Sequence, residues 1–374
     1  MEGTKPRTAS SLGMFDLLKG VGMLLIVFAH TSELYPVGDI STITPVTFFL
    51  FAYRESLMAA FYIASGYGFR KRSIGKCIRQ QFKTLFKPYA YTGLATTIAH
   101  FVIHYKTFGN WNNAVYETYK VLGGFVLGLP HTATYFGQEF FSCGPMWYLL
   151  ALMIGWILLD IILNIFPESY IKWAVLGTML LGWGISLVWE APFCIAQGMV
   201  TVPYLYIGFL AKKKRLFEKK FRPLAILGLL AAALGVALGV LLTGKTDCVS
   251  LGEWTMGPVS ILLDGIVGLG FIVLFMKVQR LLDNPVTHLI EAVGRRSLYI
   301  FCIHTVELTA VPWYLMVQKY AAAPTKGLWL QYAVSLGSIF LLCEILLRRR
   351  DVMLKFFPAR RRHFAEHQRY VAKH

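Results

Sequence analysis

His30 is the residue of this sequence best placed to do chemistry, because it is a titratable group at the end of a long apolar run. The run GVGMLLIVFA precedes it, and Glu33 follows three residues later. Ionisable groups inside membrane helices are energetically costly, so they are candidates for function. A neutral imidazole can act as a general base near pH 7. Glu33, one helical turn on, could orient the imidazole or could be an ordinary carboxylate at a helix end.

His304 and Glu307 form a second candidate pair in another apolar segment. Because they are three residues apart, they share one face of a helix. His304 lies ~15 Å along that helix from Gly294, which is close to the middle of a membrane. Two buried histidines favour a shared polar cavity. The alternative is a purely structural contact between His304 and Glu307 that fixes the helix bundle.

Lys19 lies eleven residues before His30, a spacing that corresponds to ~16 Å along a helix. This places a cation near the cytosolic face of the membrane and the imidazole in the outer half. The arrangement suits a long donor molecule whose charged head stays in the cytosol while its reactive end reaches inward. Lys19 could equally extend to the lipid headgroups.

Arginine and lysine residues cluster after the second apolar stretch. Seven of them, and no acidic residue, lie in the 18 residues from Arg70 to Lys87. Arg295 and Arg296 precede the segment of His304. Cations are normal in cytosolic loops, but this cluster exceeds that need and suits the phosphates of a nucleotide-like donor. The predicted donor-binding residues are Lys19, Arg70, Arg72, Arg79, Lys83, Arg295 and Arg296.

The elements that must position these residues are membrane helices. Of the 374 residues, 56% are hydrophobic and 15% charged, and the mean hydropathy is +0.54. This composition excludes a single soluble globular domain. Apolar segments of about 20 residues predict ten helices in an all-α polytopic integral membrane protein. They cover residues 14–35, 45–69, 86–105, 146–166, 172–189, 195–211, 223–243, 255–276, 295–317 and 328–347.

The loops between these helices alternate in charge, and this predicts the topology. Loops rich in Lys and Arg are expected in the cytosol, and an even helix count then places both termini there. Residues 1–347 would form the transmembrane domain, and residues 348–374 a basic cytosolic tail on an anionic membrane surface. We infer that the host membrane is a bacterial-type plasma membrane.

Several other classes of site are not predicted. The net charge of +17 does not indicate nucleic acid binding, because the cations form short clusters between apolar segments. The six cysteines show no metal-ligand spacing, so no metal site is expected. Cys143, Cys194 and Cys248 are expected outside the membrane, where two of them could pair.

The longest connection, residues 106–145, is assigned to the outer side and is rich in aromatic residues. Its centre, residues 121–129, could be a short interfacial or re-entrant segment. Aromatic rings beside polar groups can stack on sugars, but most of these rings fit the ordinary interfacial belt of a membrane protein.

Five short segments, taken in order along the chain, carry a resemblance to a known family. They are FDLLKGVGMLLIVFAH (15–30), FYIASGYGF (61–69), FKTLFKPY (82–89), MWYLLAL (146–152) and RRSLYIFCIH (295–304). Together they resemble the acyltransferase 3 family of membrane acyltransferases. The resemblance implies ten helices, an acyl-CoA donor that enters from the cytosol, and acceptors that are commonly sugar hydroxyls of lipopolysaccharide, peptidoglycan or exopolysaccharide. The family's first-helix arginine is Lys19 here, so a planar side chain that could hold two oxygens is missing.

These observations predict an O-acyltransferase that uses acetyl-CoA or another short acyl-CoA. His30 would take the proton from an acceptor hydroxyl so that its oxygen attacks the thioester, and a transient acyl-imidazole is the covalent variant. His304 would orient the acceptor or stabilise the oxyanion, and the resemblance places Trp147 nearby. The predicted catalytic residues are His30, His304 and Glu33, and the predicted acceptor-binding residues are Trp147 and Glu307.

Two other functions are alternatives. A proton-coupled transporter or exporter of a lipid or sugar could use His30, His304 and Glu307 as a proton relay. A non-catalytic scaffold or receptor could bind a partner through the aromatic outer connection. Thermal stabilisation by CoA would distinguish the enzyme from both, because a ligand that binds the folded state stabilises it.

Overall fold

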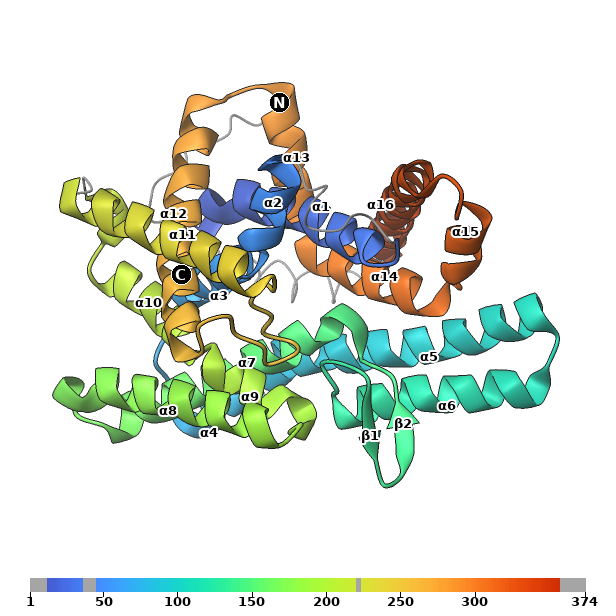
Figure 1. The fold of residues 1–374 in the computed structure, drawn as a ribbon, viewed down its shortest axis with the longest axis horizontal. Helices are drawn as coiled ribbons and strands as arrows, with labels where there is room; N and C mark the ends of the chain where they lie inside the picture. The colour runs from blue at the N-terminus through green and yellow to red at the C-terminus, as the bar shows by residue number, and fades with distance from the viewer. Residues whose placement is uncertain (1–11, 36–44, 220–222, 357–374) are drawn as a thin grey trace.

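The computed structural model describes residues 12–35, 45–219 and 223–356, and helices dominate all three ranges (Figure 1). The helices are α1 (Asp16–Ser32), α2 (Pro45–Ala52), α3 (Arg54–Gly68), α4 (Ile74–Gln81), α5 (Lys87–Phe108), α6 (Trp111–Leu127), α7 (Trp147–Ile165), α8 (Glu168–Val188), α9 (Ile195–Val200), α10 (Val202–Lys213), α11 (Pro223–Thr243), α12 (Pro258–Leu281), α13 (Pro285–Arg295), α14 (Ser297–Ala310), α15 (Tyr314–Lys319) and α16 (Pro324–Phe356). A small antiparallel hairpin is formed by β1 (Ala133–Tyr135) and β2 (Gln138–Phe140).

Short helical turns complete the described secondary structure. Single 3-10 turns cover Leu12–Phe15, Gly144–Met146, Pro192–Cys194 and Leu216–Glu218, and a π-helical turn covers Phe82–Phe86. The turns at 12–15, 144–146 and 192–194 lead directly into α1, α7 and α9.

Six of the described helices are long and apolar enough to cross a membrane, namely α1, α7, α8, α11, α12 and α16. The pair α9 and α10, bent by 50° at its break, would make a seventh span. Pro203 at the start of α10 explains this bend, because a proline inside a continuous helix removes one backbone hydrogen bond. The chain is therefore an all-α, multi-pass membrane protein, as its composition predicts.

The predicted number of ten spans is not confirmed. Each predicted range overlaps a described helix, but α3 has 15 residues and α14 has 14, fewer than the ~20 that cross a bilayer unaided. The predicted helix at residues 295–317 ends at Ala310, because Pro312 disfavours helical backbone at the residue before it. Both chain ends and most of the basic tail lie outside the described residues, so their cytosolic location stays a prediction.

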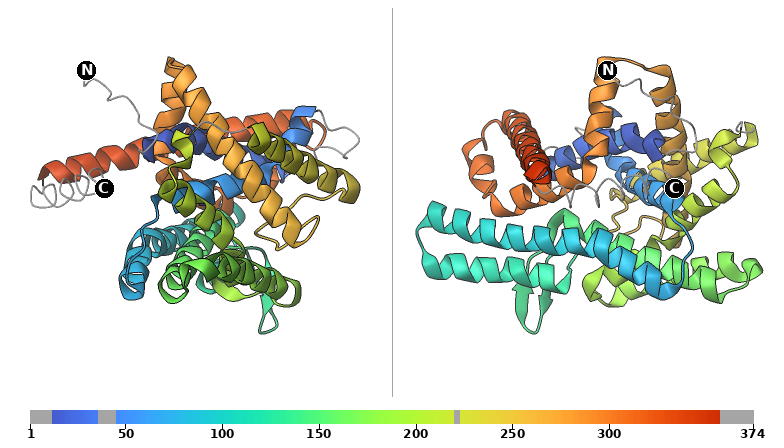
Figure 2. Two further views of the ribbon diagram at one scale, coloured as in Figure 1. Left: turned by 90° about the vertical axis from the view of Figure 1, so that its left-hand side faces the viewer. Right: turned by 180° about the vertical axis from the view of Figure 1, so that it is seen from behind.

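The connection at residues 106–145 contains a 17-residue helix, α6, and is not an irregular loop throughout. Gly109, with φ of 68°, ends α5, and the side chain of Asn110 then caps α6 by accepting a hydrogen bond from Asn113 N–H. Helix α6 runs back along α5, where the Tyr89 hydroxyl donates to the Phe125 carbonyl at 2.6 Å. Figures 1 and 2 show this antiparallel pair projecting from the rest of the molecule.

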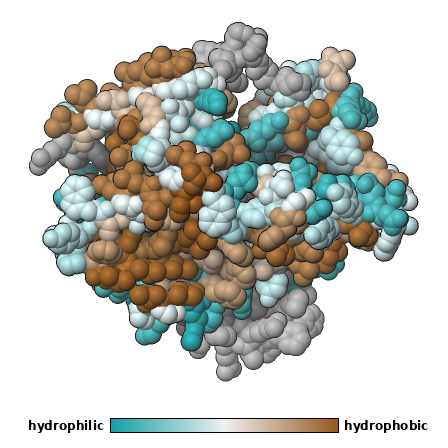
Figure 3. Space-filling model, turned by 60° about the horizontal axis from the view of Figure 1, so that its bottom comes forward, coloured by the Kyte–Doolittle hydropathy of each residue, from teal (hydrophilic) through white to brown (hydrophobic). Residues whose placement is uncertain are grey.

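The surface is apolar over much of its area, as expected of a protein surrounded by lipid. On the face in Figure 3, apolar side chains cover a broad continuous area, and hydrophilic side chains gather beside it. On α11, the outward side chains Leu227, Leu230 and Leu234 are each at least 60% exposed. An apolar patch of this size is rare on soluble monomers and is suited to a membrane.

Helix α1 lies within a group formed by α12, α13, α14 and α16. Two glycines allow its close approach to α13. A Cβ at Gly20 would lie 2.0 Å from the Ile290 carbonyl oxygen, and a Cβ at Gly294 would lie 1.9 Å from that of Asp16. Small residues of this kind let membrane helices approach at backbone distance. This contact fixes α1 against the segment that leads into α14.

Candidate active site

The packing of α1 against α14 brings His30 and His304 together. Their ring centroids are 5.6 Å apart, and the ring planes are inclined by 38°. The His304 side chain is only 1% exposed, whereas that of His30 is 30% exposed. The pair therefore combines one imidazole that a ligand can reach with one that lies behind it in the bundle.

Each imidazole has a carboxylate at the same ring nitrogen. His304 Nδ1 lies 3.1 Å from Glu307 Oε2, and His30 Nδ1 lies 3.4 Å from Glu33 Oε2. Both contacts join residues three apart on or at the end of a helix, where side chains are neighbours. A carboxylate at Nδ1 favours the tautomer with its proton there, so Nε2 is left as the hydrogen-bond acceptor.

The buried pair is held from a third helix. Ser335 on α16 donates its hydroxyl proton to Glu307 Oε1 at 2.7 Å, so both carboxylate oxygens of Glu307 have partners. His304 Nε2 is buried and has no hydrogen-bond partner among the described residues. A fixed imidazole with an unused acceptor nitrogen can bind a hydroxyl proton of a substrate.

Sequence reasoning missed Arg54, which holds the more exposed pair. Its Nη1 lies 3.2 Å from Glu33 Oε1, and its Nε lies 3.8 Å from Glu55 Oε1. Arg54 begins α3, directly after the helix break at Tyr53. The sequence did offer a signal for this site, since the charged residues Arg54 and Glu55 stand next to each other inside the apolar range 45–69.

A buried acidic group adjoins this cluster and was also missed. Asp264 is the one acidic residue in α12, and its Oδ1 accepts a hydrogen bond from the Ser56 hydroxyl at 2.5 Å. Asp247, in the loop before α12, accepts from Thr255 N–H at 2.5 Å. Burial raises the pKa of Asp247, although hydrogen bonds from Thr255 oppose the rise. The first contact joins α3 to α12, and the second closes the loop at residues 244–257 on itself.

Two of the predicted donor-binding residues lie together near the start of α1. Lys19 Nζ is 3.1 Å from Asp16 Oδ1, and Arg295 Nη1 is 3.9 Å from Asp16 Oδ2. Arg295 also approaches Glu291 at 3.8 Å. The two cations therefore lie on either side of a carboxylate near the start of α1, where Lys19 is eleven residues before His30.

Of the other predicted donor-binding residues, Arg79 and Lys83 lie apart from this pair, whereas Arg296 directly follows Arg295. Arg79 and Lys83 are exposed on α4 and the turn after it, which pack on α7, and Figure 1 shows α4 well away from α13. The backbone N–H of Arg72 donates to Asp160 Oδ1 at 2.9 Å. Arg70 is exposed at the end of α3, and Arg296 pairs with Glu344 at 3.3 Å.

Trp147 lies at the start of α7 and is buried. Its ring contacts Tyr148 at 6.3 Å, and Tyr148 in turn contacts Phe301 of α14 at 6.0 Å. Trp147 is therefore linked to the helix of His304 through Tyr148.

The cysteines are all free thiols. The Cys143 and Cys194 side chains are in hydrogen-bonding contact, whereas the Cys248 thiol lies 3.2 Å from Ser250 Oγ. Of the three cysteines predicted to lie outside the membrane, Cys143 and Cys194 are thus the two that meet. Among the described residues, no group of three or more His, Cys, Asp or Glu side chains is arranged to hold a metal ion.

Comparison with known proteins identifies the family. Residues 13–348 match the acyltransferase 3 family, described as an acyltransferase domain. No curated protein and no solved structure matches the chain. The match covers most of the chain and includes both histidine–glutamate pairs. The chain therefore belongs to the acyltransferase 3 family and is a membrane acyltransferase.

Proposed function

We propose that this acyltransferase moves an acetyl or other short acyl group from cytosolic acyl-CoA to a hydroxyl of a glycan or cell-envelope acceptor, with His30 as general base. The observation that carries the proposal is the meeting of His30 and His304 across α1 and α14, each with a carboxylate at Nδ1. Because His30 is the more exposed of the two, an acceptor hydroxyl can reach its free nitrogen.

In the proposed reaction, His30 Nε2 takes the acceptor's hydroxyl proton while the hydroxyl oxygen attacks the thioester carbonyl carbon. The carbon–sulfur bond then breaks, and the CoA thiolate takes the proton from the imidazolium. Glu33 keeps the other ring proton on Nδ1 and stabilises the imidazolium. In the covalent variant, the His30 nitrogen attacks the thioester first and the carbon–sulfur bond breaks to release the CoA thiolate. The acceptor hydroxyl then attacks the acyl-imidazole, the carbon–nitrogen bond breaks, and the hydroxyl proton passes to the thiolate.

His304 and Glu307 would orient the acceptor in this scheme. With its Nδ1 proton directed at Glu307, His304 has Nε2 free to accept a hydrogen bond from a second acceptor hydroxyl. Holding the acceptor in this way lowers the entropy lost in reaching the transition state. Trp147, through Tyr148, would support the wall on which the acceptor lies.

Lys19 and Arg295 would hold the donor's phosphates at the other end of α1. Their distance along the helix from His30 suits an extended pantetheine arm that carries the thioester inward. With ten spans and both termini in the cytosol, these cations lie on the cytosolic side of a plasma membrane, where acyl-CoA is made. Asp16 between them keeps the cations in position before the donor binds.

The test measures CoA release by purified protein in nanodiscs that receive acetyl-CoA and a panel of glycans, together with the Tm with and without CoA. Wild type should release CoA only when an acceptor is present, and CoA should raise its Tm. His30→Ala should lose release but keep the rise in Tm.

His104→Ala is the matched control, because its ring is also half-buried and also lies beside another imidazole. This variant should release CoA at the wild-type rate. If wild type shows neither CoA release nor stabilisation by CoA, the acyl-CoA proposal is wrong, and a proton relay through His30 and His304 becomes the better account.

A further inference from the structure

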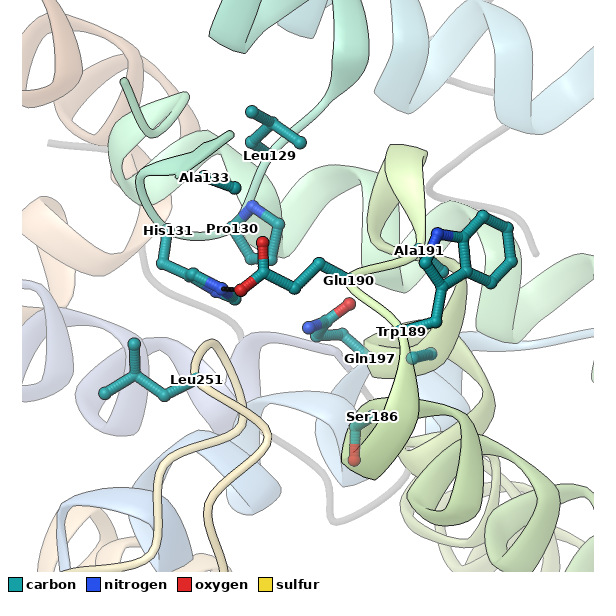
Figure 4. Close-up of a pocket in the computed structure, with 11 residues that line it drawn as sticks. Leu129, Pro130, His131, Ala133, Ser186, Trp189, Glu190, Ala191, Gln197 and Leu251 are labelled. Atoms are coloured by element: carbon teal, nitrogen blue, oxygen red, sulfur yellow. Dashed lines mark ion pairs between the residues drawn. The ribbon is translucent and has the colours of Figure 1, made fainter. Parts of the chain in front are cut away.

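A second polar site lies apart from the histidine pair, in a pocket between the loop after α6, the end of α8 and the start of α9 (Figure 4). The cavity has a volume of about 60 Å³ and opens to the surface. Its polar lining includes His131, Glu190, Gln197 and Ser186, and Trp189 stands beside them. The proposed catalytic scheme does not use these residues.

A histidine bridges two polar groups of the pocket. His131 Nε2 lies 3.0 Å from Glu190 Oε1, and His131 Nδ1 lies 3.1 Å from the Ser250 carbonyl oxygen. The Glu190 carboxylate therefore already has a partner inside the pocket, and it is not free to pair with a charged group of a ligand.

The pocket offers an unused acceptor at its centre. Gln197 is only 6% exposed, and its Nε2 donates to the Ser250 carbonyl oxygen at 3.3 Å. Its Oε1 is buried without a hydrogen-bond partner among the described residues. A buried acceptor that lacks a partner is unfavourable, so a ligand that brings a hydroxyl donor is favoured.

The aromatic side chain completes the match to one class of ligand. Trp189 also lines the pocket and is 57% exposed, and its indole lies on the opposite side from the Glu190 carboxylate, which points to His131 (Figure 4). A sugar ring presents an apolar C–H face together with hydroxyl donors, which fits this combination of side chains. The cavity is small enough that the hydroxyl-bearing edge of one ring fills it while the rest of the ring covers Trp189.

We propose that this pocket is a subsite for one neutral sugar residue of the acceptor, separate from the residue that is acylated. The inference rests on the proposed function, since it assumes a glycan acceptor. This subsite would make the enzyme select acceptors by a sugar residue other than the one that is acylated.

One loop connects this subsite with the catalytic histidines. In the segment before α12, Val249 lies beside Glu55 and Cys248 lies beside Arg54, which holds Glu33. The next residue, Ser250, accepts hydrogen bonds from both His131 and Gln197. A sugar held by Gln197 therefore lies on the same side of the molecule as the accessible end of the His30 site.

The test measures the binding of methyl glucoside and methyl N-acetylglucosaminide by saturation-transfer NMR. The protein is held in phosphatidylcholine nanodiscs free of glycoside detergents, and glycerol serves as the polyol without a ring. Wild type should bind at least one glycoside and not glycerol. Trp189→Ala and Gln197→Leu should weaken that binding at least about tenfold, which is the loss of a ring contact or a hydrogen bond of roughly 1.4 kcal/mol.

Two controls separate this proposal from the catalytic one. Trp173→Ala removes an indole of similar exposure, 61%, from α8 outside the pocket and should bind glycosides like wild type. His30→Ala should lose acyl transfer and keep glycoside binding. No glycoside binding by wild type, or equal binding by Trp189→Ala, would overturn the subsite and leave acyl transfer unaffected. Binding that needs Trp189, without acyl transfer to any glycan, would instead refute the proposed function alone.

Discussion

Two pairs of histidines in this molecule have nearly the same ring separation and very different surroundings. The His100 and His104 rings are 5.4 Å apart, and the His30 and His304 rings are 5.6 Å apart. The first pair lies four residues apart on one helix, where neighbouring rings follow from helix geometry alone. The second pair comes from α1 and α14, so its contact depends on the tertiary packing of the whole bundle.

The hydrogen-bond partners also distinguish the two pairs. His100 Nδ1 contacts the Thr118 hydroxyl at 2.9 Å, and the His104 ring packs on Phe108 at 4.7 Å. In the other pair, each Nδ1 faces a glutamate. A hydroxyl can satisfy a neutral imidazole, but a carboxylate also stabilises the imidazolium that forms during proton transfer. Ring proximity is therefore a weak sign of a catalytic site, and paired carboxylates are a stronger one.

The largest difference in acyl transfer is expected between variants of the two buried histidines, His304 and His100. His304→Ala should lower acyl transfer about 10²- to 10³-fold, because it removes a fixed group that binds the acceptor in the transition state. His100→Ala also removes a buried imidazole and should leave transfer unchanged, with a loss of stability of about 1 kcal/mol from its hydrogen bond. Initial rates and Tm of both variants test this. Equal losses of transfer would mean that the two pairs do not differ in function.

A smaller effect is expected when the carboxylate of the buried pair becomes an amide. Glu307→Gln preserves the size of the side chain and the contact with Ser335, but it removes the charge that holds the proton on His304 Nδ1. We expect transfer to fall about tenfold, the equivalent of one charged hydrogen bond of roughly 1.5 kcal/mol. The change should appear in kcat with a similar KM for acyl-CoA. A raised KM for acyl-CoA alone would place Glu307 in donor binding.

The smallest effect on acyl transfer is expected for a substitution of Arg54, which contacts Glu33 of the exposed His30–Glu33 pair. Burial raises the pKa of Glu33, but the hydrogen bond from His30 and the charges of His30 and Arg54 outweigh it, so the net pKa is lowered. Arg54→Gln removes one of these charges, and the pKa of Glu33 should rise. The carboxylate form is then lost at a higher pH as the solution is acidified. The acid limb of the pH–rate profile should move to higher pH, with only a twofold to fivefold loss near pH 7, about 1 kcal/mol or less.

Arg348→Gln is the matched control for this substitution. It breaks another exposed arginine–glutamate contact, between Arg348 Nε and Glu344 Oε1 at 2.9 Å, far along α16. Its pH–rate profile should equal that of wild type. A shift of the acid limb in both variants would show that net charge, rather than the Glu33 contact, determines the profile.

The sequence predicted the apolar helices well because hydropathy depends on composition within one segment. The same method failed for α6, where Asn113, Glu117 and Lys120 interrupt the apolar pattern. The helix forms nevertheless, because Asn110 caps its first turn and one side of it packs on α5. A glycine followed by Asn110 at residues 109–110 was the local signal for this second helix.

The candidate site was only partly accessible to sequence reasoning. His30, Glu33, His304 and Glu307 could be selected because charge inside an apolar segment is costly. Ser335 could not be selected, since a serine on an apolar helix is common and only the packing of α16 on α14 brings it to Glu307. Whether the predicted donor-binding cations form one group also depends on packing, and the structure separates Arg79 on α4 from Arg295 on α13.

The central claim is that His30 is the accessible base and His304 its buried partner. The most direct measurement is acyl transfer by His30→Ala and His304→Ala with and without added imidazole. Imidazole should restore part of the activity of His30→Ala, because this side chain is 30% exposed, and none of that of His304→Ala, whose side chain is 1% exposed. Wild-type activity of His30→Ala without imidazole, or equal rescue of both variants, would contradict the claim.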